Sequence, residues 1–377
     1  MCLGVCLDPG GPGDDPIATM SPTATTAVLP DLARRDDAAY LDFVEGFREY
    51  ILGKGADFED RLDAQARAEA GRRGKAWTDL EELRAYLQRF PLTRMRDRLV
   101  RTQQEMKWHR LARSYGDRRK ELEAELARWD NQGPGKLLLD PAFKVPDYAN
   151  VEFHLQPGGY YHDALSGFLY HYGTKVFFRG GNDQDELHGA LVGRAPPPAD
   201  GKVRRVLDMA CSVGQSSTAF KRRFPQAEVT GIDYAAPMLR VAHRRAAMAG
   251  LDVTFAQRLV EKTGFPDAHF DITFAFIVFH ELPVRIIQET VREAARVTRP
   301  GGRFIVYDFT ESAIKSPYQL YHRWFDARHN GEPYSQDFCD CNLDAVLANN
   351  GFVVDADVEA QRSGGAGYMK HWFATRA

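Results

Sequence analysis

Residues 206–217 constrain the fold of this chain more than any other stretch. An apolar strand, Val206-Leu207, runs into the acidic residue Asp208, and a loop of small residues follows. Ser216 marks the expected start of a helix directly after this loop. A strand, a tight turn and a helix in this order place backbone N–H groups beside a ligand at the helix N-terminus. Small residues suit the loop, because larger side chains would hold a ligand away from the backbone.

Three later segments sharpen this interpretation. Residues 229–233, Val-Thr-Gly-Ile-Asp, read as a second apolar strand that ends in a carboxylate, where dinucleotide-type folds bind ribose hydroxyls. Residues 270–279 form an apolar run typical of a buried parallel strand, and His280-Glu281 follows it. An amphipathic segment, residues 286–297, leads to Pro300-Gly301-Gly302 and another strand. The alternation of strands and helices predicts an α/β fold.

Together these landmarks resemble those of class I S-adenosylmethionine-dependent methyltransferases, and in motif style the ubiquinone/menaquinone-biosynthesis-like small-molecule enzymes. The resemblance covers about residues 201–377 and implies a Rossmann-like, seven-stranded α/β domain that transfers a methyl group. A nicotinamide-binding Rossmann domain is the competing interpretation, since it also needs a Gly-rich turn and a later acidic residue. That family usually lacks both the acidic residue at the first strand's end and a matching Pro-Gly-Gly, so we favour the methyltransferase.

The resemblance also implies the cofactor, S-adenosyl-L-methionine, with S-adenosyl-L-homocysteine as product. Asp208 and the loop after it would hold the methionine moiety, and Asp233 would accept both ribose hydroxyls, because one carboxylate can take two donors. Tyr234 or Met238 would lie along the adenine, and residues 257–261 would read its edge. The expected cofactor-binding residues are Asp208, Ala210, Cys211, Ser212, Gly214, Asp233, Tyr234, Met238, Gln257, Glu261 and Phe276.

The sequence departs from the family pattern at two places. Ala210 and Ser212 stand where relatives usually have glycine, and we expect binding to survive because both side chains are small. Leu259 stands where relatives often place an aspartate that accepts from the adenine amine. Gln257 or a nearby backbone carbonyl would have to supply that contact instead.

His280 and Glu281 are the candidate catalytic residues. They follow the fourth strand at its carboxyl end, which in a doubly wound sheet lies beside the ligand. Methyl transfer is an in-line displacement that alignment and exclusion of water accelerate, and a base is needed only when the nucleophile must lose a proton. The alternative is that His280 caps the strand and orients the substrate pocket.

Residues 147–194 are rich in aromatic residues and glycine, a composition that suits a lid over the cofactor. The alternative is a seam of aromatic side chains between two domains. The aromatic segment near residues 307–329 favours a planar or apolar acceptor. The expected substrate-wall and lid residues are Tyr160, Tyr161, Tyr307, Tyr321, His322 and Trp324.

The chain divides into four expected parts. Residues 1–30, rich in Gly, Pro, Thr and Asp, read as a disordered leader. Residues 31–150 carry apolar side chains at three- and four-residue spacings, which predict a helical N-terminal domain. Residues 151–200 form the lid and a linker, and residues 201–377 the methyltransferase domain. Within the helical part, Thr78 with Glu81 predicts a capping box.

Residues 91–120 hold ten Lys and Arg against three acidic residues, so an RNA or protein methyltransferase is an alternative to a small-molecule enzyme. We favour a solvated basic face, because the charges spread around the helix. The net charge of −3 and a pI near 6.4 give no general reason to bind nucleic acid or a membrane. A non-catalytic S-adenosylmethionine-binding module is the other alternative.

Compartment, metal and assembly are only weakly indicated. Five scattered cysteines, no apolar run of membrane-spanning length and a start unlike a signal peptide favour a cytoplasmic protein. Cys339 and Cys341 with His322 and His329 match no standard zinc spacing, so we expect no metal. The helical domain can mediate a homodimer.

Overall fold

The computed structural model describes residues 29–52, 57–178, 181–309, 316–355 and 369–377. Its centre is an eight-stranded sheet in the order β1-β4-β3-β2-β5-β6-β8-β7. The first six strands run parallel wherever they pair, and β8 is antiparallel to both β6 and β7. The strands are β1 (Lys136–Leu138), β2 (Arg205–Met209), β3 (Glu228–Asp233), β4 (Val253–Gln257), β5 (Phe270–Phe276), β6 (Thr298–Phe309), β7 (Phe352–Val354) and β8 (Met369–Arg376).

Two apolar clusters cover the two faces of the sheet, because successive strand residues point to opposite sides. On β2, Leu207 belongs to a cluster with α10 (Val284–Val297) and α13 (Leu343–Asn349). Its neighbour Val206 belongs to a second cluster, with α7 (Glu186–Arg194), α8 (Gln215–Arg223) and α9 (Ala236–Met248). Helices on both faces of a mainly parallel sheet confirm the predicted Rossmann-like architecture.

The sheet contains one strand more than predicted. Strands β2 to β8 are the seven expected from the methyltransferase resemblance. The additional strand, β1, comes from the region expected to be helical and pairs with β4 in the register Lys136↔Thr254 to Leu138↔Ala256. Three residues give too short a pattern to reveal a strand, and β1 is stable only because the edge of β4 accepts it.

The predicted N-terminal helices are present. They are α1 (Arg35–Leu52), α2 (Phe58–Arg73), α3 (Leu80–Leu87), α4 (Pro91–Asp117) and α5 (Arg119–Trp129). The predicted capping box was wrong by one residue: Asp79, not Thr78, caps α3, and its carboxylate accepts the backbone N–H groups of Glu81 and Glu82. All of the predicted leader except residues 29 and 30 lies outside the described residues.

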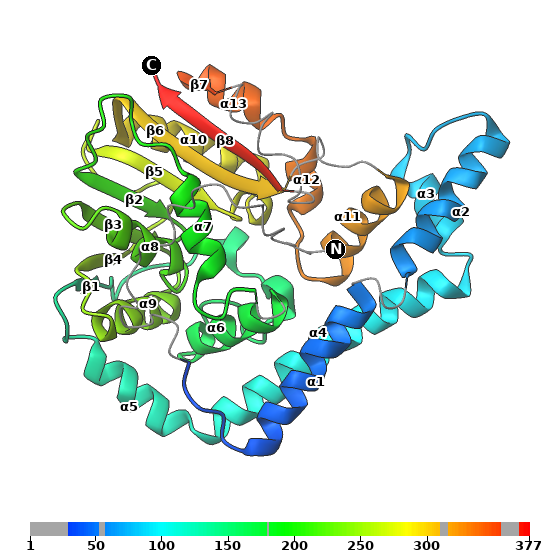
Figure 1. Cartoon of the computed structure of the whole chain (residues 1–377), viewed down its shortest axis with the longest axis horizontal. Coiled ribbons are helices and arrows are strands. Elements are labelled where there is room, and N and C mark those ends of the chain that lie inside the picture. The colour runs from blue at the N-terminus through cyan, green and yellow to red at the C-terminus, as the bar shows by residue number, and fades with distance from the viewer. Residues whose placement is uncertain (1–28, 53–56, 179–180, 310–315, 356–368) are drawn as a thin grey trace, which may run out of the picture.

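The helical part packs directly on the methyltransferase part. In Figure 1, α1 and α4 run side by side along the lower right, and α5 reaches α9 below the sheet. Leu41 of α1, Leu111 of α4, Phe168 of α6 (Ser166–Phe177) and Val241 of α9 belong to one apolar cluster. The pairs Arg240–Asp130 and Arg244–Glu125, each 2.7 Å, join α9 to the end and middle of the α5 region.

The remaining short elements complete the walls around the sheet's carboxyl end. Helix α11 (Pro317–His329) packs on α2 and α3 at the right of Figure 1, and α12 (Ser335–Asp340) follows it. Three 3-10 turns lie at residues Asp147–Ala149, Phe153–Leu155 and Phe279–Glu281. No described helix is both long and apolar enough to cross a membrane.

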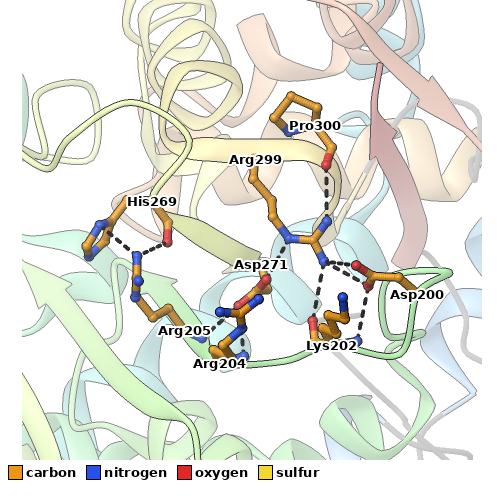
Figure 2. Close-up of polar contacts among 8 residues, drawn as sticks. All are labelled: Asp200, Lys202, Arg204, Arg205, His269, Asp271, Arg299 and Pro300. Carbon is orange, nitrogen blue, oxygen red and sulfur yellow. Dashed lines mark hydrogen bonds and ion pairs between the residues drawn. The ribbon is translucent and has the colours of Figure 1, made fainter.

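Polar contacts at the opposite end of the sheet account for the Arg-Pro-Gly-Gly sequence. Asp271, at the start of β5, accepts the backbone N–H groups of Arg204 and Arg205 at 2.8 and 2.9 Å and the Arg299 guanidinium at 2.6 Å (Figure 2). A side chain at Gly302 would lie 2.8 Å from the Arg299 carbonyl and 2.9 Å from that of Asp271. Glycine is therefore needed where β6 enters the sheet.

Most basic side chains of residues 91–120 have partners within the protein. Arg96 is fully buried and lies over the Phe325 ring, and Lys107 is buried over Trp108. Arg110 and Arg113 both contact the buried carboxylate of Asp37. Ion pairs also involve Arg98 and Arg101 with Glu105, Arg118 with Glu121, and Arg119 with Asp163.

Candidate active site

A large pocket lies at the carboxyl ends of β2 to β5, beneath α4 and α6. It encloses about 1300 Å³ together with its open mouth. The sheet contributes lining residues that follow its strands, and the helical part contributes rings. These rings belong to Trp108, Phe153, Tyr160, Tyr170, Phe177 and Phe178.

The loop between β2 and α8 has a conformation that favours glycine. Ala210 and Ser212, the two departures from the family pattern, have φ values of +57° and +51°, and Gly214 has +75°. Side chains at positive φ are strained, which explains why relatives usually have glycine there. Ala210 and Ser212 nevertheless line the pocket, so the loop keeps the shape that the pattern requires.

Asp208 lies under this loop and does not line the pocket. Its carboxylate is 2% exposed and accepts the Ser217 hydroxyl of α8 at 2.5 Å. Burial, opposed by the hydrogen bond from Ser217, raises the pKa of Asp208 to about 7. Cys211 and Gly214 are also outside the lining. They pack instead against Gly231 of β3 and against Phe255 and Ala242, respectively.

Asp233 faces the pocket from the end of β3. One carboxylate oxygen accepts the Ser212 N–H at 3.0 Å and the other accepts the Ala235 N–H at 2.9 Å. Each oxygen keeps a second lone pair, so the carboxylate can still accept two ligand hydroxyls. Burial, partly offset by these backbone hydrogen bonds, raises the pKa of Asp233 to about 6.

Some of the residues expected to contact the cofactor line the pocket, and two others do not. Tyr234, Met238 and Phe276 line the pocket as expected, and Leu259 lines it as well. Gln257 does not, because its amide accepts from the Asp140 N–H at 3.1 Å and donates to the Tyr234 carbonyl at 2.9 Å. Glu261 is also outside the lining and accepts the Tyr148 hydroxyl at 2.7 Å.

Charged groups gather at the other end of the pocket. His280 is 1% exposed, and its Nδ1 lies 2.7 Å from the buried carboxylate of Asp308 on β6. Glu281 accepts the Tyr160 hydroxyl at 3.0 Å and lies 3.2 Å from Nε2 of His154. The sequence therefore placed His280, Glu281 and Tyr160 in one site, and the fold adds His154 and Asp308.

The carboxylates of this end favour the protonated histidines. Burial opposes the charge on His154, but the nearby carboxylates of Glu281 and Glu332 raise its pKa to about 10. Burial likewise opposes the charge on His280, and Asp308 raises the pKa of that imidazole above its ordinary value.

Five of the expected substrate or lid residues lie outside the pocket lining. Tyr161 is half-buried, and its ring meets the ring of His162 edge-on. Tyr307 is buried in the sheet, with its hydroxyl on the Leu191 carbonyl at 2.9 Å. Tyr321, His322 and Trp324 belong to α11, which faces α2 and α3.

The four side chains considered as zinc ligands are likewise engaged elsewhere. His322 pairs with Asp326 at 2.8 Å, and His329 packs on the ring of Phe325. Cys339 accepts the Arg323 guanidinium. Among the described residues, the one group of three or more metal-type side chains is His154, His280 and Glu281.

Sequence reasoning missed the residues that the helical part brings to the pocket. Trp108 donates from Nε1 to the His154 carbonyl at 2.7 Å, and His154 has a strained φ of +54°. Gln215, at the start of α8, donates to Asp185 at 2.6 Å, and Asp185 also pairs with the buried Arg245. No local pattern marks these residues, because they meet only through contacts between distant segments.

Comparison with known proteins identifies relatives of part of this chain. Residues 206–302 match the family described as "Methyltransferase domain". A demethylmenaquinone methyltransferase of Thermus thermophilus is 38% identical over 109 residues, which are 28% of this chain and 47% of that protein. The ubiquinone/menaquinone biosynthesis C-methyltransferase UbiE of Bdellovibrio bacteriovorus is 37% identical over 110 residues, 29% of this chain and 46% of that protein.

The solved structures found are more distant. The YcgJ protein of Bacillus subtilis is 21% identical, with a TM-score of 0.36, over 50% of this chain and 94% of that one. This chain spans about half the length of the two methyltransferases named above.

The fold, the loop after β2 and the family match together define a class I S-adenosylmethionine-dependent methyltransferase domain. Within that class, the domain is distantly related to the UbiE and menaquinone methyltransferases. The pocket fits the cofactor of this family: Asp233 can accept the ribose hydroxyls, and Met238 and Leu259 offer apolar contact to an adenine.

Proposed function

We propose that this protein transfers a methyl group from S-adenosylmethionine to a small-molecule acceptor that is planar, aromatic or apolar. One observation carries the proposal: a pocket joins the Asp233 end to the His280–Glu281 end, and nine Phe, Tyr and Trp side chains are among its lining residues. A methyl donor at the first end would face an acceptor at the second. The rings offer flat apolar surfaces of the kind that planar ligands bind.

The residues of the pocket would divide the work in a simple way. The bound cofactor supplies an electrophilic methyl group on its sulfonium. Asp233 would hold the ribose, and the loop at Ala210 and Ser212 would approach the methionine moiety. Trp108 and Tyr170 would orient the acceptor and exclude water, which together can lower the barrier to an in-line displacement. Where the nucleophile is a hydroxyl, its proton would pass toward His280 or Glu281.

Calorimetric titration tests the cofactor half of the proposal. S-adenosylmethionine and S-adenosylhomocysteine should bind the wild-type chain, and Asp233→Ala should weaken both by about 10- to 100-fold, the usual value of charged hydrogen bonds. Asp252→Ala is the matched control, because Asp252 is exposed. Absence of binding to the wild type would refute the proposal. Binding without turnover on any acceptor would favour a non-catalytic module.

The acceptor half needs a screen with a labelled methyl group. Hydroxylated aromatic and quinone-like molecules should be methylated, and His280→Gln should lower kcat more than it weakens cofactor binding. A polyanionic acceptor has less support, because most basic side chains of α4 are paired inside the protein. Methylation of RNA in preference to every small molecule would overturn the proposed acceptor class.

A further inference from the structure

Three side chains at the acceptor end of the pocket have the arrangement of metal ligands. His154, His280 and Glu281 each offer one ligand atom, and these atoms lie within 4.8 Å of one another. Nε2 of His154 is 3.2 Å from the Glu281 carboxylate. Ligands about 2.0–2.1 Å from one zinc-type ion lie about 3.0–3.4 Å apart, so this pair already has the required spacing. A shift of at most about 1.4 Å would bring the third ligand into range.

A carboxylate stands behind each of the two histidines. Asp308 lies 2.7 Å from Nδ1 of His280. Glu332 lies 3.1 Å from Nδ1 of His154, at an ion-pair distance but out of line for a good hydrogen bond. Metal-binding histidines commonly have such a partner, because it fixes the ring and increases the basicity of the nitrogen that binds the ion. Because Nδ1 of each ring faces one of these carboxylates, Nε2 would be the ligand atom.

Side chains of helix α4 position His154 and Glu332, which the sheet does not hold in place. Gln104 of α4 donates to Asn330 at 2.9 Å, and Asn330 donates to Glu332 at 3.0 Å. Trp108, one turn further along α4, holds the His154 carbonyl. His154 and Leu155 both have positive φ, a strained backbone that is maintained only where surrounding contacts impose it.

The charges of the site are compatible with a divalent cation. Glu281, Glu332 and Asp308 bring three carboxylates to two imidazoles in a largely buried place. Nitrogen ligands select zinc, iron or cobalt over magnesium and calcium, which prefer oxygen ligands alone.

We propose that His154, His280 and Glu281 bind a divalent transition-metal ion whose remaining coordination positions face the pocket. The acceptor would bind the ion through an oxygen atom close to the position that is methylated. That assignment of the oxygen ligand rests on the proposed function, whereas binding of the ion does not. The proposal differs from the sequence-based expectation of no metal, which considered Cys339 and Cys341 with His322 and His329.

Cobalt titration of the full-length chain tests the site. After treatment with a chelator and its removal, the protein should bind one equivalent of Co²⁺ with a visible absorption band, and Zn²⁺ should displace it. His154→Asn and Glu281→Gln should each weaken binding at least about 100-fold, and Asp308→Asn by about 10- to 100-fold, as for other partners behind metal ligands. His188→Asn is the matched control, because His188 lines the same pocket outside the three-residue group.

The outcomes separate this inference from the proposed function. A cobalt spectrum that His154→Asn and Glu281→Gln remove and His188→Asn retains supports the site. Failure of the wild type to bind Co²⁺ or Zn²⁺, or equal binding by all variants, means protonated imidazoles only and overturns it. Titration of S-adenosylmethionine into the metal-free protein gives the second readout, since cofactor binding with no metal binding would leave the proposed function intact. Circular dichroism establishes that each variant is folded.

Discussion

Three residues in or next to the loop between β2 and α8 have conformations or surroundings that lower the stability of the folded protein. Asp208 is an ionisable group that lies buried with a hydroxyl as its partner rather than a cation. Ala210 and Ser212 hold backbone conformations that glycine adopts more readily. Such features are tolerated at functional sites because the surrounding packing imposes them. Each therefore predicts a variant that is more stable than the wild type.

Asp208→Asn should change the pH dependence of stability. The pKa of Asp208 is about 7 in the folded protein and about 3.9 in an unfolded chain, so between these values the folded state holds a proton that the unfolded state has lost. The free energy of unfolding then falls as pH rises through this window, on the order of 3 kcal/mol. Asparagine cannot ionise, so the variant should lose less stability between pH 5 and pH 8.

Urea unfolding at the two pH values measures this difference. Asp252→Asn is the control, because Asp252 is exposed and should behave as the wild type does. An equal fall in stability for the wild type and Asp208→Asn would show that Asp208 is ionised in the folded protein at pH 5.

Ala210→Gly and Ser212→Gly should each raise the free energy of unfolding by about 0.5–1 kcal/mol. Relief of the left-handed conformation contributes about 1–2 kcal/mol, and the greater freedom of glycine in the unfolded chain removes part of it. Ala219→Gly, within α8, is the control and should cost about 1 kcal/mol. Thermal unfolding compares the three, and destabilisation by both loop variants would contradict the strain argument.

At the scale of elements, α4 and α6 form the wall of the pocket that the sheet cannot provide. They pack so closely at one point that a side chain at Gly173 would lie 2.4 Å from the Trp108 ring. Trp108 in turn holds the His154 carbonyl. The contact between two helices thus determines where a residue of the site lies.

Gly173→Ala should displace Trp108 and lower stability by about 1–3 kcal/mol, the usual cost of overpacking. It should also weaken whatever binds at the His154 end of the pocket. Gly189→Ala in α7 has nothing within 4 Å of the added atom and should leave stability unchanged or raise it by up to about 1 kcal/mol. Thermal unfolding and Trp fluorescence compare the two, and equal behaviour would mean that the α4–α6 contact is looser than the structure shows.

At the scale of the whole molecule, the helical part and the methyltransferase part share an apolar cluster. Leu111, Phe168 and Val241 lie within it and come from α4, α6 and α9. Parts that share a core lose it together when either unfolds. The described residues therefore predict one cooperative unfolding transition for both parts.

Differential scanning calorimetry should show a single transition whose calorimetric and van't Hoff enthalpies agree. Leu111→Ala, which empties a fully buried position, should cost about 2–5 kcal/mol and lower the melting temperature of the entire transition. Two resolved transitions, only one of which moves with Leu111→Ala, would show that the two parts fold independently.

Local sequence patterns predicted the α/β fold and the side of the pocket that the carboxyl ends of the strands form. Asp233, His280 and Glu281 follow apolar strands, and carboxyl ends of parallel strands meet at one edge of a sheet. This rule needs only local patterns. This rule did not predict the positions of Gln257 and Glu261. Gln257 accepts a hydrogen bond from the Asp140 N–H, and Glu261 accepts one from Tyr148.

The residues around His280 and Glu281 could be identified only from the tertiary structure. His154 lies more than a hundred residues before Asp308 and Glu332 in the chain, and these two belong to different segments. The three side chains nevertheless surround His280 and Glu281. Neither a period nor a spacing records such a meeting, since it depends on how α4 packs on α6 and on the turn at Phe153–Leu155. The local physics of strands and turns fixed one half of the site, and long-range packing fixed the other.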